Sequence, residues 1–300
     1  MYRETTLDTT ASLDSAEHAL DRQRHAQRWR YLLRDKKALI GLITLTILVL
    51  AAIAAPLVVP FDPNAMDYEM IEAPSWTHPL GTDDLGRDLL SRLIYGTRIS
   101  LFVGLSTVAI SLVIGIVLGV VGGYMGGWFD AIIMRYIDLQ WAFPNFIIAV
   151  YLVAVFGTGL SNVIVAISLA FIDDFARIAR GMVLTIREEQ YVDAAHTLGA
   201  SDARIMWRHI LPNAMAPLVA EFGLRFCFVF LFISALSFLG LGIQPPTADW
   251  GSMVRDNATL ITFGDFTPLL AAGSIALLTV GVNFVVDWFL RITSGLRDEQ

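Results

Sequence analysis

Charged residues and cysteines are scarce in this sequence. Of its 300 residues, 16% are Asp, Glu, Lys or Arg, whereas 55% are hydrophobic. This balance excludes an ordinary soluble domain, in which about a quarter of the residues are charged, and it indicates an integral membrane protein. The single cysteine, Cys227, lies in an apolar stretch and cannot form an internal disulfide, so we interpret it as a small packing residue.

Motifs for nucleotide binding, catalysis and metal binding are also missing. A Walker A loop places a lysine directly after a glycine to hold phosphates, but the only lysines, Lys36 and Lys37, follow no glycine. There is no His-Glu-x-x-His or Gly-x-Ser-x-Gly pattern, and the five histidines are scattered. The aspartates of "GTDDLGRD" (81–88) lack the spacing of a calcium-binding EF-hand loop. We therefore expect no catalytic residue, no metal site and no cofactor bound by this chain.

Six apolar stretches are candidates for membrane-spanning helices. A hydrocarbon core about 30 Å thick is crossed by about 20 helical residues. The candidate stretches are 38–60, 99–121, 139–156, 160–182, 214–241 and 267–286. The first, second and last contain no charged residue, whereas the third contains Pro144 and the fourth and fifth contain charged side chains. The sequence thus predicts an all-α membrane protein with six transmembrane helices.

The distribution of Lys and Arg predicts which side of the membrane each loop occupies. Basic residues crowd positions 22–37, directly before the first apolar stretch, and the positive-inside rule then places the N-terminus in the cytoplasm. With six crossings the C-terminus returns to the cytoplasm, so 188–213 is cytoplasmic while 61–98 and 242–266 are external. Because the basic residues form no surface stripe and the net charge is −7, we expect no nucleic-acid partner.

This topology divides the chain into consecutive segments. We interpret the first helix as an uncleaved anchor, because no short apolar core near the start is followed by a small-residue cleavage site. The predicted segments are a cytoplasmic tail (1–37), an N-terminal transmembrane helix (38–60), an external segment (61–98), a five-helix core (99–290) and a second cytoplasmic tail (291–300).

The cytoplasmic stretch 188–213 is unusually polar for this chain. Four residues with helical spacing form a narrow apolar stripe on a short helix: Tyr191, Val192, Ala195 and Leu198. Gly199 stands where a helix end favours a left-handed residue, and Ser201 and Pro212 are the expected start and end of a second short helix. Two short helices that meet at a glycine fit a groove on a soluble partner, and they fit equally an amphipathic connector that lies on the membrane.

Individual residues of this stretch match a known motif. The order of Asp193-Ala194-Ala195, Gly199 and Leu211-Pro212 resembles the EAA loop of ABC importer permeases. Three further segments are similar to the oligopeptide and dipeptide permeases: "HPLGTDDLGRDLLSRLIYGTRISL" (78–101), "GGYMGGWFDAIIMRYID" (122–138) and "ALSFLGLGIQPPTADWGSM" (235–253). With an N-terminal span before a five-span core, the chain resembles the C-type permease of such a pair from about residue 30 to residue 290.

The resemblance implies a fold and a set of partners. The fold is that of a type I ABC importer permease, N-in and C-in, with a coupling helix at 188–205. Within loop 188–212 the motif residues that would dock on the ATPases are Asp193, Ala194, Ala195, Gly199, Leu211 and Pro212. The implied partners are a second permease subunit, two ABC ATPase subunits that hold ATP and Mg, an extracytoplasmic solute-binding protein and the lipid bilayer of a prokaryotic cytoplasmic (inner) membrane. Asp193 stands where relatives have glutamate and His209 where isoleucine is common, so docking can differ in detail.

The resemblance also implies a mechanism and a class of cargo. Alternating access between the two permeases would carry peptides or related small polar solutes. A metal chelate, an opine or glutathione is an alternative cargo for the same kind of importer. An ion-coupled secondary transporter is a second alternative, because charges lie inside two spans. It would leave the polar loop without a purpose, and the sequence shows no inverted repeat.

Four charged residues inside predicted spans stand out: Asp173, Asp174, Glu221 and Arg225. A charged side chain at mid-bilayer costs about 2.5 to 3.5 kcal/mol on insertion scales, so these residues should face protein or water. Glu221 precedes Arg225 by four residues, the favourable order for a helical ion pair, and helical rise gives Asp173 and Glu221 comparable depths. We hypothesise that the four residues line a translocation path and favour a cationic solute; an ion network that only braces the bundle is the alternative.

A set of glycines in the second span predicts a close helix contact. Gly115, Gly119, Gly123 and Gly127 recur every four residues, which gives one small face. The neighbouring helix can belong to this chain or to a partner permease.

The external segments carry a capping residue and two tryptophans. Thr82 is the expected N-cap of a helix that runs to Tyr95, with Asp83 and Asp84 in its first turn. Trp76 and Trp250 fit anchoring at the membrane surface.

Overall fold

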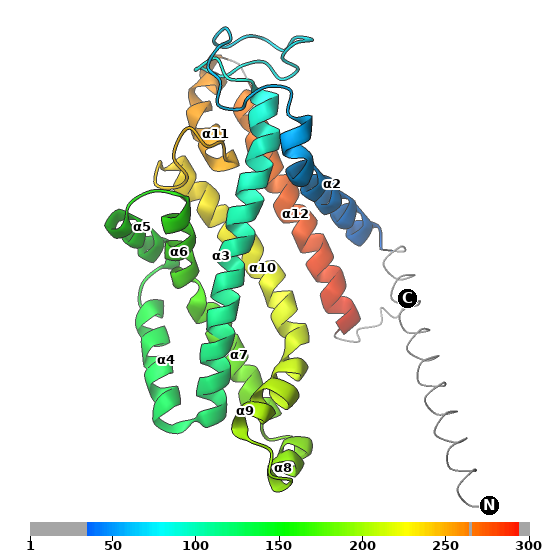
Figure 1. Cartoon of the computed structure of the whole chain (residues 1–300), viewed down its shortest axis with the longest axis vertical. Coiled ribbons are helices and arrows are strands. Elements are labelled where there is room, and N and C mark those ends of the chain that lie inside the picture. The colour runs from blue at the N-terminus through cyan, green and yellow to red at the C-terminus, as the bar shows by residue number, and fades with distance from the viewer. Residues whose placement is uncertain (1–34, 264–265, 294–300) are drawn as a thin grey trace, which may run out of the picture.

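The computed structural model describes residues 35–263 and 266–293, and in this part of the chain all regular elements are helices. In chain order they are α2 (Lys36–Val58), α3 (Leu89–Met125), α4 (Gly127–Trp141), α5 (Asn145–Phe156), α6 (Leu160–Ala170), α7 (Ile172–Ile186), α8 (Gln190–Thr197), α9 (Asp202–Ile205), the π-helical turn η1 (Met206–Ile210), α10 (Leu211–Phe238), α11 (Trp250–Asp256), the 3-10 turn η2 (Ala258–Phe263) and α12 (Thr267–Thr293). They form an elongated bundle with the 59–88 loop and α11 at one end and α8 at the other (Figure 1). Most of the predicted tails 1–37 and 291–300 lies outside the described residues.

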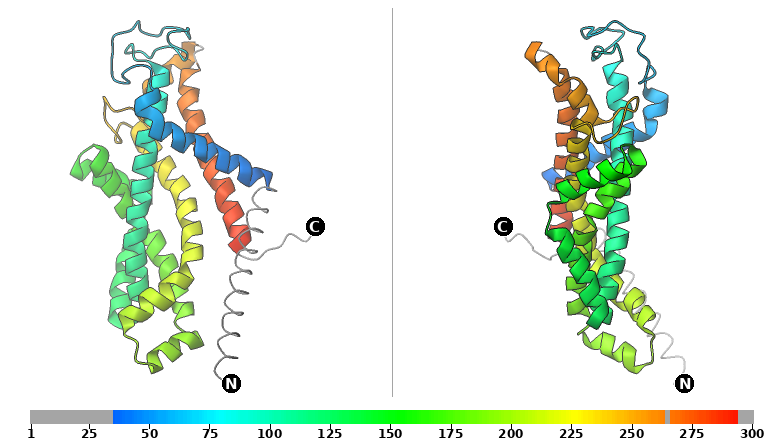
Figure 2. Two further views of the ribbon diagram at one scale, coloured as in Figure 1. Left: turned by 45° about the vertical axis from the view of Figure 1, so that its right-hand side comes forward. Right: turned by 90° about the vertical axis from the view of Figure 1, so that its left-hand side faces the viewer.

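Helix α3 runs the height of the bundle, and α7, α2, α10 and α6 pack against it (Figure 1). Its length follows from its sequence, since residues 89–125 contain no proline to interrupt the backbone hydrogen bonds. Helix α2 crosses α12 obliquely (Figure 2). A Cβ atom on Gly41 would lie 2.6 Å from the carbonyl oxygen of Gly281, so a glycine at this position lets the two backbones touch.

Four helices are long and apolar enough to cross a membrane: α2, α3, residues Pro217–Phe238 of α10, and residues Thr267–Ile292 of α12. Helices α4 and α5 qualify as a fifth span if they are counted together, although they are bent by 91° at the break between them. The described residues therefore contain four or five candidate spans by this measure, where the sequence predicts six.

Two of the predicted spans are not single helices. The stretch 139–156 breaks between α4 and α5, because Pro144 has no N–H to donate and disfavours a helical conformation of the preceding residue. The stretch 160–182 is divided at Phe171 into α6, with 11 residues, and α7, with 15. This break places Asp173 and Asp174 in the first turn of α7, where the helix dipole favours negative charge.

The apolar core lies between α3, α5, α6, α10 and α12. Cys227 is buried in it, and its thiol lies 3.6 Å from the carbonyl oxygen of Thr279, as expected for a packing residue. A separate apolar cluster lies at the α8 end of the bundle, beneath α3 and α7, and consists of Val120, Val183, Val192, Ala195, Ile205 and Ile210. This second cluster positions the polar stretch 188–213.

The expected N-cap at Thr82 is wrong. Helix α3 begins at Leu89, and Asp88 caps it by accepting a hydrogen bond from the backbone N–H of Ser91 at 2.8 Å. The helix cannot start earlier, because Gly86 has a φ of +69° and interrupts right-handed backbone. The Thr82 hydroxyl instead fastens the preceding loop, donating to the carbonyl of Glu69 at 2.5 Å.

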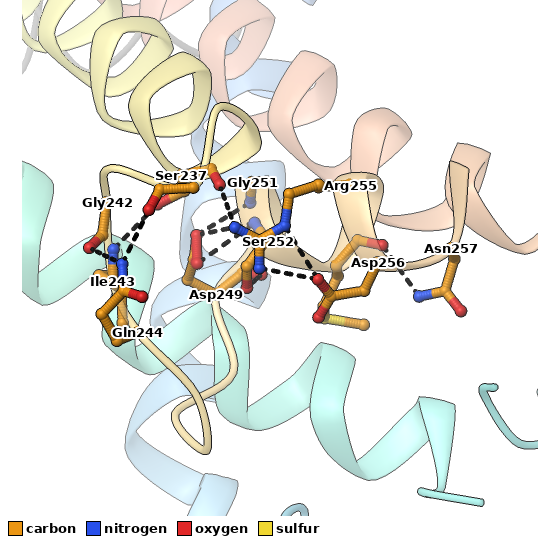
Figure 3. A network of polar contacts seen from close by, with 12 residues as sticks. Ser237, Gly242, Ile243, Gln244, Asp249, Gly251, Ser252, Arg255, Asp256 and Asn257 are labelled. Atoms are coloured by element: carbon orange, nitrogen blue, oxygen red, sulfur yellow. Dashed lines mark hydrogen bonds and ion pairs between the residues drawn. The ribbon is translucent and has the colours of Figure 1, made fainter. Parts of the chain in front are cut away.

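Helix α11 is fixed to this end of the bundle by its first residues (Figure 3). Asp249 is its N-cap and accepts hydrogen bonds at 3.1 Å from the N–H groups of Gly251 and Ser252. Burial raises the pKa of Asp249, and hydrogen bonds from Ser252 oppose that rise. Trp250 is not the expected surface anchor, because it is fully buried and its indole N–H donates to the carbonyl of Leu93 in α3 at 3.1 Å.

Candidate functional site

Helix α8 lies at the far end of the bundle from the 59–88 loop (Figure 1) and ends at a glycine. Gly199 has a φ of +79°; its N–H donates to the carbonyl of His196 at 2.9 Å, and the N–H of Ala200 donates to the carbonyl of Ala195 at 3.0 Å. This pair of bonds is the Schellman termination, which favours glycine. A Cβ on Gly199 would meet no atom within 4 Å. Backbone conformation, rather than crowding, therefore requires the glycine.

The apolar stripe predicted for α8 is divided between two faces. Val192 and Ala195 are 1% and 7% exposed and pack into the apolar cluster beneath α3 and α7. In contrast, Leu198 is 87% exposed and Tyr191 is 40% exposed. The outer face of α8 thus consists of Tyr191, Asp193, Ala194 and Leu198. An open depression beside it is lined by Thr185, Glu188, Glu189, Gln190, Tyr191 and Ala194.

Polar contacts tie α8 and α9 to the end of α3. The hydroxyl of Tyr124 donates to Asp202 at 2.9 Å, which leaves its oxygen to accept from Nε2 of His196, also at 2.9 Å. These partners lie 72 and 78 residues from Tyr124 in sequence, so no periodicity could reveal them. On the other side of α8, the amide of Asn213 donates to the hydroxyl of Tyr191 at 3.1 Å. Helix α8 is therefore held by buried apolar contacts and by hydrogen bonds to two long helices.

Pro212 does not end the second short helix, although the sequence predicts that it does. Helix α9 continues through η1 into α10, so one helical run extends from Asp202 to Phe238. The N–H of Leu211 bonds to the carbonyl of Met206, five residues earlier, and this wider π turn accommodates the proline that follows. Leu211 and Pro212 therefore lie inside the connection between α8 and a membrane-spanning helix.

The ion cluster predicted from the sequence comes together where α7 meets α10. Nε of Arg225 donates to Glu221 at 2.5 Å on the same helix, and its NH1 donates to Asp174 of α7 at 2.7 Å. The Asp174 side chain is 9% exposed, whereas Glu221 and Arg225 are 16% and 27% exposed. Asp174 is therefore nearly enclosed, whereas Glu221 and Arg225 on α10 remain partly exposed.

Asp173 does not join this ion triad by a hydrogen bond. Its side chain is completely buried, and neither carboxylate oxygen has a hydrogen-bond partner among the described residues. The N–H groups of its own turn act on it electrostatically without reaching hydrogen-bond geometry, and the nearby charges that act on it are Asp174 and Arg225.

Three of the four predicted glycines pack against α7 of the same chain. A Cβ on Gly115 would lie 2.5 Å from the Cβ of Phe175, and one on Gly119 would touch the carbonyl of Ala176. A Cβ on Gly123 would lie 3.1 Å from the Cβ of Val183. Gly127 is not part of this face, because α3 ends at Met125 and a Cβ on Gly127 would meet nothing within 4 Å.

Two arginines of α7 also tie it to α4, and no motif in the sequence singles them out. Arg180 makes two hydrogen bonds to Asp130, at 2.5 and 2.6 Å. Arg177 donates to Asp138 at 3.1 Å, and its guanidinium lies 3.9 Å from the centroid of the Trp141 ring. These pairs are 50 and 39 residues apart in sequence, so packing, and not a motif, brings them together.

Family comparison covers the helices that build these sites. Residues 98–294 match the family described as "binding-protein-dependent transport system inner membrane component". Residues 26–74 match the "N-terminal TM domain of oligopeptide transport permease C". The first match includes loop 188–212, the ion cluster and the glycine face.

Curated relatives are similar along most of their length. The dipeptide transport system permease protein DppC of Alkalihalophilus pseudofirmus is 38% identical over 273 residues, which cover 91% of this chain and 88% of the relative. The di/tripeptide transport system permease protein DppC of Pseudomonas aeruginosa is 39% identical over 277 residues, covering 90% and 89%. The glutathione transport system permease protein GsiD of Pectobacterium atrosepticum is 38% identical over 272 residues, covering 90% and 88%.

A solved structure shares the fold. A chain of the MetNI methionine ABC transporter in inward-facing conformations aligns with a TM-score of 0.57 and 17% identity, covering 70% of this chain and 98% of that chain. At this identity the likeness concerns the fold alone. The family match over 98–294 and relatives at 38–39% identity carry the assignment further. The chain belongs to the family of binding-protein-dependent transport system inner membrane components and is a permease subunit of an ABC transporter.

Proposed function

We propose that the chain is the C-type permease of an ATP-driven importer for peptides or closely related small polar solutes. Relatives named for dipeptides and for glutathione are each 38% identical to it, so identity does not separate these cargoes. Both kinds of molecule contain amide bonds and a free amino group. A peptide-like solute with an amino group is therefore the cargo class that the comparison supports.

The proposed topology has six crossings with both chain ends in the cytoplasm. Helices α2, α3, α10 and α12 each supply one crossing. The bent pair α4 and α5 supplies another, and α6 with α7 supplies the sixth. The basic residues at 22–37 and loop 188–212 then share the cytoplasmic side, in agreement with the positive-inside rule. The cytoplasmic tails, the external segment and the five-helix core keep the boundaries predicted from the sequence.

Loop 188–212 is the proposed docking element for the ATPase subunits, which hold ATP and Mg. One observation carries this proposal: α8 is fastened to the bundle on one side while Leu198 on its outer face is 87% exposed. An exposed leucine at a helix end gains free energy when a partner covers it, about 1.5 to 3 kcal/mol for full burial. The membrane-connector alternative would instead place the same side chain in lipid.

The contacts of α8 give the proposed coupling a physical route. When the ATPases close on ATP, they would displace α8. The bonds from Tyr124 to His196 and Asp202 pass that displacement to α3, and the continuous helical run from Asp202 passes it to α10. Together with a second permease subunit, this motion would open the path alternately to the binding protein outside and to the cytoplasm.

A co-purification experiment tests docking. The tagged complex is isolated in mild detergent as wild type, Leu198→Ala and Leu198→Glu, and the ATPase subunits are quantified by mass spectrometry. The matched control is Leu85→Ala, which changes an exposed leucine at the opposite end of the bundle. We expect at least about tenfold less ATPase with the Leu198 variants and no change with the control. Equal recovery of ATPase from all four proteins would contradict the docking role of α8.

A further inference from the structure

The charges between α7 and α10 do not balance. Three carboxylates, Asp173, Asp174 and Glu221, share one arginine. Arg225 directs Nε to Glu221 at 2.5 Å and NH1 to Asp174 at 2.7 Å, so neither of these hydrogen bonds reaches Asp173. Arg177 of α7, which also acts electrostatically on Asp174, is paired with Asp138 and stacked on Trp141. With all four groups ionised, the three carboxylates and the one arginine sum to a net charge of −2, so the cluster lacks positive charge.

Asp173 shows where that positive charge is missing. The side chain is completely buried, and neither of its oxygens has a hydrogen-bond partner among the described residues. A buried carboxylate without a partner costs several kcal/mol, and proteins generally supply a donor for such groups. The position in the first turn of α7 offsets part of this cost through the helix dipole but supplies no counter-ion.

The arrangement of the carboxylates favours an organic ammonium group over a metal ion as their partner. Within the described ranges, no three carboxylate, imidazole or thiol groups are close enough together to hold a metal ion. Calcium requires six to eight converging oxygens and magnesium requires six. An ammonium group has three N–H donors and needs no closed shell of ligands, so two carboxylates on one side suffice.

We propose that Asp173, with Asp174 and Glu221 around Arg225, binds the primary ammonium group of the transported solute; this deepens the proposed importer function and rests on it. The solute would approach from the side of α10, where Glu221 and Arg225 are partly exposed. The break at Phe171, directly before the cluster, lets the first turn of α7 move relative to α6 and uncover Asp173 during the cycle.

The first test measures binding without cargo. The purified complex is heated in methylammonium chloride, in sodium chloride and in choline chloride at equal ionic strength, as wild type, Asp173→Asn and Asp173→Leu. The control variant is Asp67→Asn, which removes an exposed acid from the 59–88 loop, far from α7 and α10. We expect methylammonium, and not choline or sodium, to raise the melting temperature of the wild type and the control. Both Asp173 variants should melt at a higher temperature than the wild type and show no response, because they lack the unpaired charge.

The second test measures transport in proteoliposomes that contain the complete importer and its binding protein. Uptake of alanyl-alanine is compared with uptake of N-acetyl-alanyl-alanine, which has no ammonium group. The same binding protein is used throughout, so its own selectivity cancels between variants. We expect Asp173→Asn to lower alanyl-alanine uptake at least about tenfold, the effect of losing one charged hydrogen bond, and to leave any acetylated-probe uptake unchanged.

Distinct outcomes would overturn the proposal. No effect of methylammonium on the wild type would mean that the cluster is neutralised by a proton or braces the helices. Equal stabilisation by sodium would assign the site to inorganic cations. Unchanged alanyl-alanine uptake in Asp173→Asn would remove the site from the solute path. In each case ATP-driven uptake by the wild type would still stand, so the importer function is judged separately.

Discussion

Replacing Gly119 with alanine should force α3 away from α7. A Cβ atom at this position would touch the carbonyl oxygen of Ala176 and lie 2.7 Å from the Cβ of Ala179 and 2.9 Å from the backbone nitrogen of Arg180. Two of these three atoms belong to the backbone of α7 and cannot rotate away. Because carbon atoms pack at about 3.5 to 4.0 Å, the helices would have to separate by roughly 1 Å.

The expected loss of stability combines two opposing effects. Overpacking in a tight interior costs about 1 to 3 kcal/mol. Alanine is a better helix former than glycine, which returns up to about 1 kcal/mol. We therefore expect Gly119→Ala to destabilise the permease by about 1 to 2 kcal/mol. Uptake should fall too, because α7, which the added methyl group would displace, carries Asp173 and Asp174.

Gly273→Ala in α12 is the matched control, because a Cβ there would meet no atom within 4 Å. Thermal unfolding of the purified complex, followed by circular dichroism, should show a lower melting temperature for Gly119→Ala and an equal or higher one for Gly273→Ala. If both variants shifted in the same direction by the same amount, the argument that α3 and α7 touch through glycine would be refuted.

Two further predictions concern a helix end and a helix start. Gly199 needs a left-handed backbone, and the space around it is open. Gly199→Asn should therefore retain the ATPase subunits in co-purification, whereas Gly199→Val, which strongly disfavours that conformation, should lose them. Equal retention of ATPase by both variants would show that the backbone at this position can change freely. At Asp249 burial raises the pKa above its ordinary value of 3.8, so ionisation opposes folding and stability should fall as pH rises from 3.8 through the raised pKa. Asp249→Asn keeps an acceptor for the N–H groups of Gly251 and Ser252 and should remove that fall, whereas Asp249→Ala should lose about 1 kcal/mol of stability with the cap. Unfolding curves between pH 4 and 7 measure both effects. If the stability of the wild type rose with pH in this range, relative to Asp249→Asn, the predicted direction of the pH dependence would be contradicted.

Local features of the sequence were sufficient for part of the site. The spacing of Glu221 and Arg225 predicted a pair on one helix, and the structure shows it at 2.5 Å. The position of Gly199 after a short amphipathic stretch predicted a left-handed helix end, which its φ of +79° shows. Each depends on residues within one or two turns of each other, and such geometry is set by the helix itself.

The contacts between distant segments could not be predicted in this way. The sequence identified Gly115, Gly119 and Gly123 as a small face but did not identify α7 as the neighbour. It treated residues 160–182 as one span, whereas packing divides them at Phe171 and so brings Asp173 and Asp174 to the start of a helix. It also assigned Leu198 and Val192 to one stripe, although one faces out and the other faces in.

The sequence by itself determined that this is a helical membrane protein with a polar loop between two of its helices, because composition and apolar runs decide whether each segment is more stable in lipid or in water. The tertiary structure alone decided which side of α8 is free, which helix the glycines contact, and that Asp173 is buried without a hydrogen-bond partner among the described residues. Those properties depend on which helices lie against each other. Contacts between residues 50 or more positions apart, such as Arg225 with Asp174, produce no periodic pattern in the sequence from which they could be predicted.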